Sequence, residues 1–307
     1  MAAIVVRRVL WSIPLLLLVM LLTFALLRGM GGSPFRLEEG GVSPALQVQL
    51  ETYYGLDDPW VFEFAHYVRN VATLDFGPSL VNRYTTVDQI VEERFPVSGE
   101  LVLLACAWAV PLGVGLGLLG AFRRNTWADY VVTTLATAML VVPVFLLAGV
   151  VSTYFVREWG LVADGWETRQ AKVLPTLVLA LAPAGYIARL VRAAAVETIQ
   201  LDYVRTARAK GLRSGRVVLL HVLPGSLGPF LSAAVPMLAL LVTGTFFVES
   251  AFRIPGAAQY FVSAALQRDY PMVMGMTVAL AAVVIAANLL ADLARISIDP
   301  RLREEET

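Results

Sequence analysis

The distribution of charge constrains this chain more than any other feature. Charged side chains are costly at bilayer depth, and a helix needs about 20 apolar residues to cross it. Six stretches of roughly this length or longer hold no Asp, Glu, Lys or Arg: residues 9–27, 101–122, 130–156, 173–188, 217–248 and 270–291. The composition agrees, since 58% of the 307 residues are hydrophobic and 16% are charged. The sequence therefore predicts an all-α polytopic membrane protein with six transmembrane helices.

The ends of these stretches adjust the predicted spans. Arg189 lengthens the fourth stretch because its charged head can reach the interface while its stem stays in lipid. The fifth stretch is too long for one crossing and holds His221 and Pro224 near its start, so its first ten residues are expected at the interface. The first stretch is longer than a signal-peptide core and is interpreted as an uncleaved helix. The predicted spans are residues 9–27, 101–122, 131–153, 173–190, 227–248 and 270–291.

Basic residues outside the spans predict the orientation, because short cytoplasmic loops are enriched in Lys and Arg. With the N-terminus inside, the cytoplasmic segments carry 14 Lys and Arg, whereas the short outer loops carry 5. Both termini are therefore predicted to be cytoplasmic. The segment 28–100 then lies outside as a subdomain with 5 basic and 11 acidic residues. Apolar residues at helical spacing predict short helices at 45–54 and 61–72, and we favour a solvated cap over a ligand site.

The residues required by several kinds of chemistry are missing from the sequence. The two lysines, Lys172 and Lys210, each follow an alanine, so no phosphate-binding G-x-x-x-x-G-K-[ST] loop exists. Two histidines cannot supply a multi-histidine metal site, and the single Cys106 cannot form an internal disulfide. A net charge of zero disfavours a nucleic-acid binder. We expect no enzymatic activity, no bound cofactor and no metal in this chain.

Polar and glycine residues inside the spans have two interpretations each. Gly115, Gly117 and Gly120 spell G-x-G-x-x-G, but they lie within a predicted span, and Gly113 with Gly117 forms G-x-x-x-G. Helix packing is therefore favoured over dinucleotide binding. Asn288, in the last span, is expected either to bond to a neighbouring helix or to line a transport pathway. No carboxylate lies in the middle of a span, which disfavours a gradient-driven carrier without excluding it.

The predicted cytoplasmic loop 189–216 is unusually basic, with seven basic and two acidic residues. Within it, L-D-Y-V-R-T-A-R-A-K-G-L at 201–212 predicts a short helix with Asp202 as its N-cap and Gly211 as its stop. Val204, Ala207 and Gly211 would form a narrow face of small residues that another protein can approach. Attraction of the loop to anionic lipid headgroups is the alternative.

This loop resembles the cytoplasmic signature loop of binding-protein-dependent ABC importer permeases, specifically the first (B-type) permease of the dipeptide/oligopeptide/nickel family. Placing the glycine of the family pattern E-A-A-x-x-x-G on Gly211 retains Ala207 and puts Arg205 and Thr206 where the pattern has Glu and Ala. Five further motifs look like the family and occur in its order: V-V-R-R-V-L at 5–10, Y-G-L-D-D-P-W at 54–60, V-E-S-A-F-R-I-P-G at 248–256, Q-R-D-Y-P at 267–271 and D-P-R at 299–301. Two outer segments depart from it: G-G-S-P at 31–34 and L-D-F-G-P-S at 74–79.

The resemblance implies a type I importer permease, residues 1–307, in the cytoplasmic (inner) membrane of a prokaryote. It implies four kinds of partner besides the lipid bilayer: a second permease in a heterodimer, two P-loop ATPase subunits that bind ATP and Mg, and an extracytoplasmic substrate-binding protein. Di- or oligopeptides are the implied substrates, with nickel chelates or oligosaccharides as alternatives. The residues implied to contact the ATPase are Tyr203, Arg205, Ala207, Lys210, Gly211 and Leu212.

Overall fold

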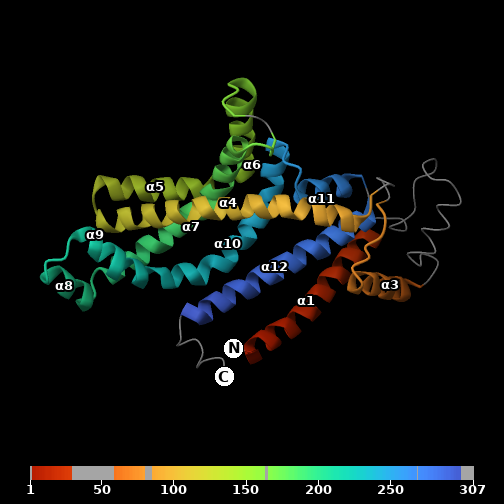
Figure 1. Cartoon of the computed structure of the whole chain (residues 1–307), viewed down its shortest axis with the longest axis horizontal. Coiled ribbons are helices and arrows are strands. Elements are labelled where there is room, and N and C mark those ends of the chain that lie inside the picture. Colours follow the sequence, from red (N-terminus) through yellow and green to blue (C-terminus); the bar gives the residue numbers. More distant parts are fainter. Residues whose placement is uncertain (1, 30–58, 80–84, 163–164, 268, 299–307) are drawn as a thin grey trace. The chain divides into compact units, whose positions relative to one another are not determined.

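The computed structural model describes residues 2–29, 59–79, 85–162, 165–267 and 269–298, and Figure 1 shows the trace. These residues form helices and no β-strand, with one isolated bridge between Pro78 and Thr86. The predicted all-α class is therefore confirmed for the described part of the chain. The longer helices are α1 (Ala2–Gly29), α4 (Val87–Phe122), α5 (Trp127–Val141), α7 (Arg169–Thr198), α10 (Leu223–Phe252) and α12 (Tyr270–Ile298). The shorter elements are α3 (Trp60–Ala72), α6 (Val144–Val151), α8 (Asp202–Ala209), α9 (Ser214–Val217), α11 (Ala257–Leu266) and the π-helical segments η1 (Ser152–Glu158) and η2 (Val218–Val222).

Four of these helices are long and apolar enough to cross a membrane, namely α1, α4, α7 and α12. The count reaches 5 if α5 with α6 and η1 is taken as one bent span. The predicted fifth span, residues 227–248, lies within α10, but many side chains of this helix are outside the described set. The six-span count and the cytoplasmic termini therefore stay predictions.

The third predicted span is broken rather than straight. The helix over Trp127–Val141 and that over Val144–Glu158 meet at 93°. Val142 between them has an extended conformation, with φ −69 and ψ 121. Pro143 explains the break, because its ring excludes the helical conformation from the preceding residue and it has no N–H to donate. Val142 and Pro143 are uncharged, so the uncharged stretch runs through the break. The absence of charge therefore predicted one span where the structure has two helices.

The chain divides into two compact units, Met1–Ser98 with Pro255–Ala286, and Gly99–Ile254 with Ala287–Thr307. In the first unit, the helix predicted at 61–72 is confirmed as α3, whereas the one predicted at 45–54 lies outside the described residues. Phe64 and Tyr67 of α3 pack against a buried cluster that includes Phe24 of α1 and Met276 of α12. This core encloses one face of α3, which accounts for its amphipathic sequence.

In the second unit, α7 packs against α5, α6 and α10. Gly113 and Gly117 of α4 also pack on it. A Cβ at Gly113 would lie 2.6 Å from Cβ of Ile187, and a Cβ at Gly117 would lie 2.7 Å from the carbonyl oxygen of Ala188. Only glycine allows this approach, so the helix-packing interpretation of G-x-x-x-G is confirmed. Gly115 points elsewhere, since a Cβ there would meet nothing within 4 Å.

Candidate functional site

The short helix predicted in the basic loop is present as α8, but it starts differently from the prediction. The N-cap is Leu201, with extended φ and ψ, and Asp202 is the first helical residue. The prediction of Asp202 as the cap is therefore wrong. The turn that follows α7 sets this start, because Leu201 accepts the backbone N–H of Val204 at 3.0 Å. Asp202 instead lies 3.6 Å from Arg205, one turn further along an exposed surface.

The end of α8 follows the prediction. Gly211 has φ +77, a left-handed conformation that favours glycine. Its N–H donates to the carbonyl oxygen of Arg208 at 2.9 Å, and the N–H of Leu212 donates to that of Ala207 at 3.4 Å. These two bonds form a Schellman motif, which satisfies the last carbonyls of the helix. Gly211 therefore fixes where α8 stops and how the chain leaves it.

The small face of α8 is turned toward the chain itself. Val204 and Ala207 are 0% and 5% exposed and belong to a buried cluster with Ala121 of α4 and Ala195 of α7. Leu212 packs against the same cluster and is half-buried. Val204 and Ala207 are therefore covered by the chain itself, and the contact of Ala207 with an ATPase stays a prediction. An amphipathic helix buries its apolar face against a neighbouring element. For α8 these elements are the ends of α4 and α7.

Tyr203 connects α8 to the segment that leads into α10. Its hydroxyl donates to the carbonyl oxygen of His221 at 3.3 Å, and its ring lies edge-on to the imidazole at 6.5 Å between centroids. A Cβ at Gly225 would lie 2.9 Å from the Tyr203 hydroxyl. Tyr203 is thus partly committed to contacts within the chain, although its side chain stays 47% exposed. The sequence did not predict this contact. His221 lies in the π-helical segment η2, whose residues do not follow the spacing of an α-helix.

The outward surface of α8 and the turn after it is basic. Its exposed cationic residues are Arg205, Arg208, Lys210, Arg213 and Arg216, and Gly211 is exposed beside them. The Arg205 side chain is 70% exposed. Among the described residues there is no group of three or more His, Cys, Asp or Glu that could hold a metal ion. The basic residues suit charge-assisted contact with an acidic surface.

Comparison with known proteins gives the family. Residues 111–304 match the model of the binding-protein-dependent transport system inner membrane component. The chain belongs to this permease family. It is 40% identical to the dipeptide transport system permease protein DppB of Bacillus subtilis over 94% of both chains. It is 36% identical to the oligopeptide transport system permease protein OppB of Escherichia coli K12, over 97% of this chain and 98% of that protein.

A solved structure shares the fold of the permease. The inward-facing methionine ABC transporter MetNI aligns with a TM-score of 0.50 and 20% identity, over 68% of this chain and 94% of that chain. At this identity the likeness shows the fold alone. The permease is therefore an inner membrane component of a binding-protein-dependent transport system by family, and it shares its fold with a chain of that ABC transporter.

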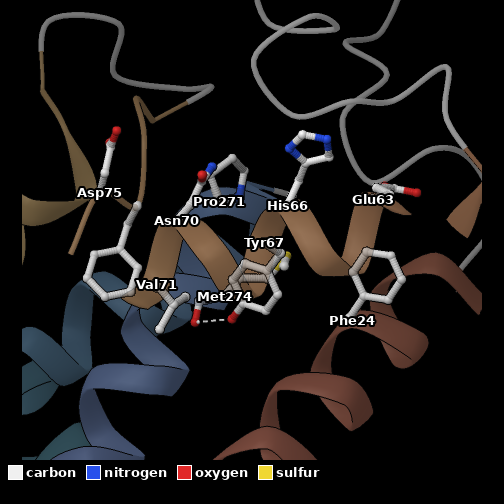
Figure 2. Close-up of a pocket in the computed structure, with 11 residues that line it drawn as sticks. Phe24, Glu63, His66, Tyr67, Asn70, Val71, Asp75, Pro271 and Met274 are labelled. Atoms are coloured by element: carbon white, nitrogen blue, oxygen red, sulfur yellow. Dashed lines mark hydrogen bonds between the residues drawn. The ribbon is translucent and has the colours of Figure 1, made fainter. Parts of the chain in front are cut away.

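Two further features of the permease lie apart from α8 in the sequence. Asn288 lies in α12 with a half-buried side chain, and its role in the pathway stays a prediction. In the first unit, Figure 2 shows a pocket beside α3, where the Tyr67 hydroxyl donates to the carbonyl oxygen of Met274 at 3.2 Å. Its volume of about 20 Å³ has room for one water molecule.

The polar groups beside this pocket are affected by burial. Glu63 pairs with Arg28 through one carboxylate oxygen, while the other has no hydrogen-bond partner among the described residues. Burial raises the pKa of Glu63, and the neighbouring Arg28 opposes that rise. Burial also raises the pKa of Tyr67. These shifts reflect the packing of α3 in the first unit and identify no chemistry.

Proposed function

We propose that the chain is the membrane subunit of an ATP-driven importer that moves di- or oligopeptides handed over by a separate binding protein. The observation that carries this proposal is α8, an anchored helix with an exposed basic surface. The names of the similar permeases support peptides as the substrate class. Nickel chelates and oligosaccharides are the alternative substrates, and an uptake assay distinguishes them from peptides.

The proposed assembly needs partners for every step that this chain does not perform. ATP and Mg would bind to two P-loop ATPase subunits, which would dock on α8. A second permease would complete the pathway, and an extracytoplasmic binding protein would deliver the substrate. The proposed location is the cytoplasmic membrane of a prokaryote, in agreement with the family description of an inner membrane component.

The burial pattern of α8 divides the proposed contact residues into two groups. Tyr203, Arg205, Lys210 and Gly211 are exposed and would touch the ATPase. Ala207 and Leu212 pack beneath them and would hold the helix against α4 and α7. A helix held in this way moves with its neighbours. Closure of the ATPase pair would therefore shift the membrane helices between two arrangements, as coupling between distant sites requires.

The first part of the test is purification of the permease from its native membrane in mild detergent, with mass spectrometry of bound proteins and an ATPase assay. The second part measures uptake of labelled peptides, nickel chelates and oligosaccharides by intact cells. The variant is Gly211→Val, because a β-branched residue at this φ costs at least about 1–2 kcal/mol. A Cβ at Gly211 would meet no atom within 4 Å, so the fold is expected to survive.

We expect the wild type to retain a P-loop ATPase and to take up peptides. Gly211→Val should reduce uptake per ATP hydrolysed about tenfold, as a strain of that size implies. Gly215→Val is the matched control, since a Cβ there also meets no atom within 4 Å and its φ is not left-handed. A wild-type chain that carries no ATPase and follows an ion gradient would overturn the proposal.

A further inference from the structure

The C-terminal end of α4, the N-terminal end of α5 and the C-terminal part of α7 meet at an ion pair that the sequence did not predict. Nε of Arg192 donates to Oδ1 of Asp129 at 2.6 Å, and Nη2 donates to Oδ2 at 2.7 Å. The Asp129 side chain is 5% exposed and that of Arg192 is 30% exposed. This bidentate geometry fixes both distance and orientation between α5 and α7, which a single contact between long side chains does not.

The carboxylate of Asp129 is also bonded to its own end of α5. Oδ2 accepts the backbone N–H of Asn125 at 3.0 Å, and Oδ1 accepts the Thr133 hydroxyl at 3.5 Å. Asn125 has φ 62, so this bond stabilises a turn conformation that few residues adopt. Asp129 also lies in the first turn of α5, where the helix dipole favours a negative charge. The carboxylate therefore holds the α4–α5 turn and α7 together.

Gly120 of α4 has no side chain and leaves room for the ion pair beside this helix. A Cβ at this position would lie 3.2 Å from Cδ of Arg192, 3.3 Å from Oδ1 of Asp129 and 3.4 Å from Cγ1 of Val132. A side chain here would crowd the guanidinium stem and the carboxylate. The third glycine of G-x-G-x-x-G thus accommodates an ion pair, whereas Gly113 and Gly117 accommodate the α7 backbone and Ile187.

The same ends of α4 and α7 carry α8. Ala121 follows Gly120 directly, and Ala195 lies about one turn beyond Arg192. Both belong to the buried cluster under Val204 and Ala207 of α8. Among the described residues of that cluster none comes from α5. The ion pair therefore links α5 to the two helix ends on which α8 rests.

We propose that Asp129 and Arg192 are positioning residues that pass movement of α8 to α5. A displacement of α8 would shift the ends of α4 and α7, and the rigid ion pair would carry α5 with them. α5 and α6 both pack on α7, and the bend at Pro143 sets them at 93° to each other, so a movement of α7 reaches them in different directions. This inference rests on the proposed function, because it needs an ATPase that moves α8.

The test uses the intact complex, purified with its ATPase and binding protein and reconstituted in lipid vesicles. Asp129→Asn and Arg192→Gln each remove one charge, and Arg192→Lys retains the charge but loses the bidentate geometry. Three quantities are measured for each: the amount of assembled complex, ATP hydrolysis stimulated by the binding protein, and substrate uptake per ATP. A purely structural role would lower the first without changing the third.

Lys172→Gln provides a matched control, because Lys172 pairs with Glu100 at 2.6 Å near the opposite end of the same helix. We expect Asp129→Asn, Arg192→Gln and Arg192→Lys to reduce uptake per ATP about tenfold, within the range of typical coupling effects. Lys172→Gln should leave this ratio unchanged. An unchanged ratio in Arg192→Lys and Asp129→Asn would overturn the inference while leaving the proposed function intact. Absence of any ATPase from the wild-type complex would instead overturn both.

Discussion

At the scale of single residues, two glycines of α4 differ sharply in what surrounds them. A Cβ at Gly117 would lie 2.7 Å from the carbonyl oxygen of Ala188 and 2.9 Å from Cβ of Val191, whereas Gly115 faces open space. Gly117→Ala should force α4 away from α7 and lower the free energy of unfolding by about 1–3 kcal/mol. Gly115→Ala should leave it unchanged or raise it by up to about 1 kcal/mol. Thermal unfolding of the purified full chain in detergent measures both, and equal midpoints would contradict this packing.

The same scale shows why some residues were predictable and others were not. Gly113 and Gly117 are four apart, so helical geometry alone places them on one face, and the sequence was sufficient to predict packing. Asp129 and Arg192 are 63 residues apart. Each lies near the end of a predicted span, where an isolated charge is ordinary. Their pairing depends on how α5 and α7 pack, and a single sequence carries no information on that.

At the scale of helices, Tyr203 decides how firmly α8 is tied to the entry of α10. Tyr203→Phe removes the donor to the carbonyl oxygen of His221 and should weaken this contact by about 0.5–1.5 kcal/mol. The ring still lies edge-on to the imidazole of His221, so the helix should form but open more often. Backbone amides of residues 202–212 are expected to exchange hydrogen faster, as measured by mass spectrometry. Tyr130→Phe, at a 69% exposed tyrosine of α5, is the control, and equal exchange in both variants would refute the link.

The helices also separate local from tertiary information. The presence of α8 and its stop at Gly211 follow from residue propensities and a left-handed glycine, both of which are local. The direction of its small face is not local, since Val204 and Ala207 give the same pattern whether they meet a partner or the ends of α4 and α7. Pro143 was visible in the sequence as a breaker. Counting uncharged residues gave it no weight, so the bend between α5 and α6 was missed.

At the scale of the whole molecule, the number of spans between two loops determines on which side each loop lies. The predicted fourth and fifth spans separate Gly160 from Leu266, so an even number of crossings places both outside. The predicted fifth span lies in α10. The hydropathy of the described residues does not test whether α10 crosses the membrane. The relative side of Gly160 and Leu266 therefore tests α10 directly. Arg124 and Arg213 lie in the predicted cytoplasmic loops and serve as the opposite reference.

Replacing Cys106 by Ser removes the only cysteine, so that new single cysteines can report each side. We expect a membrane-impermeant maleimide added to intact cells to label cysteines at Gly160 and Leu266, the latter 81% exposed in the structure. Cysteines at Arg124 and Arg213 should react only after the membrane is permeabilised, because basic loops stay inside. Labelling of Gly160 without Leu266 would mean that α10 does not cross. That result would place α8 and the segment 253–269 on one side of the membrane, contrary to the predicted topology.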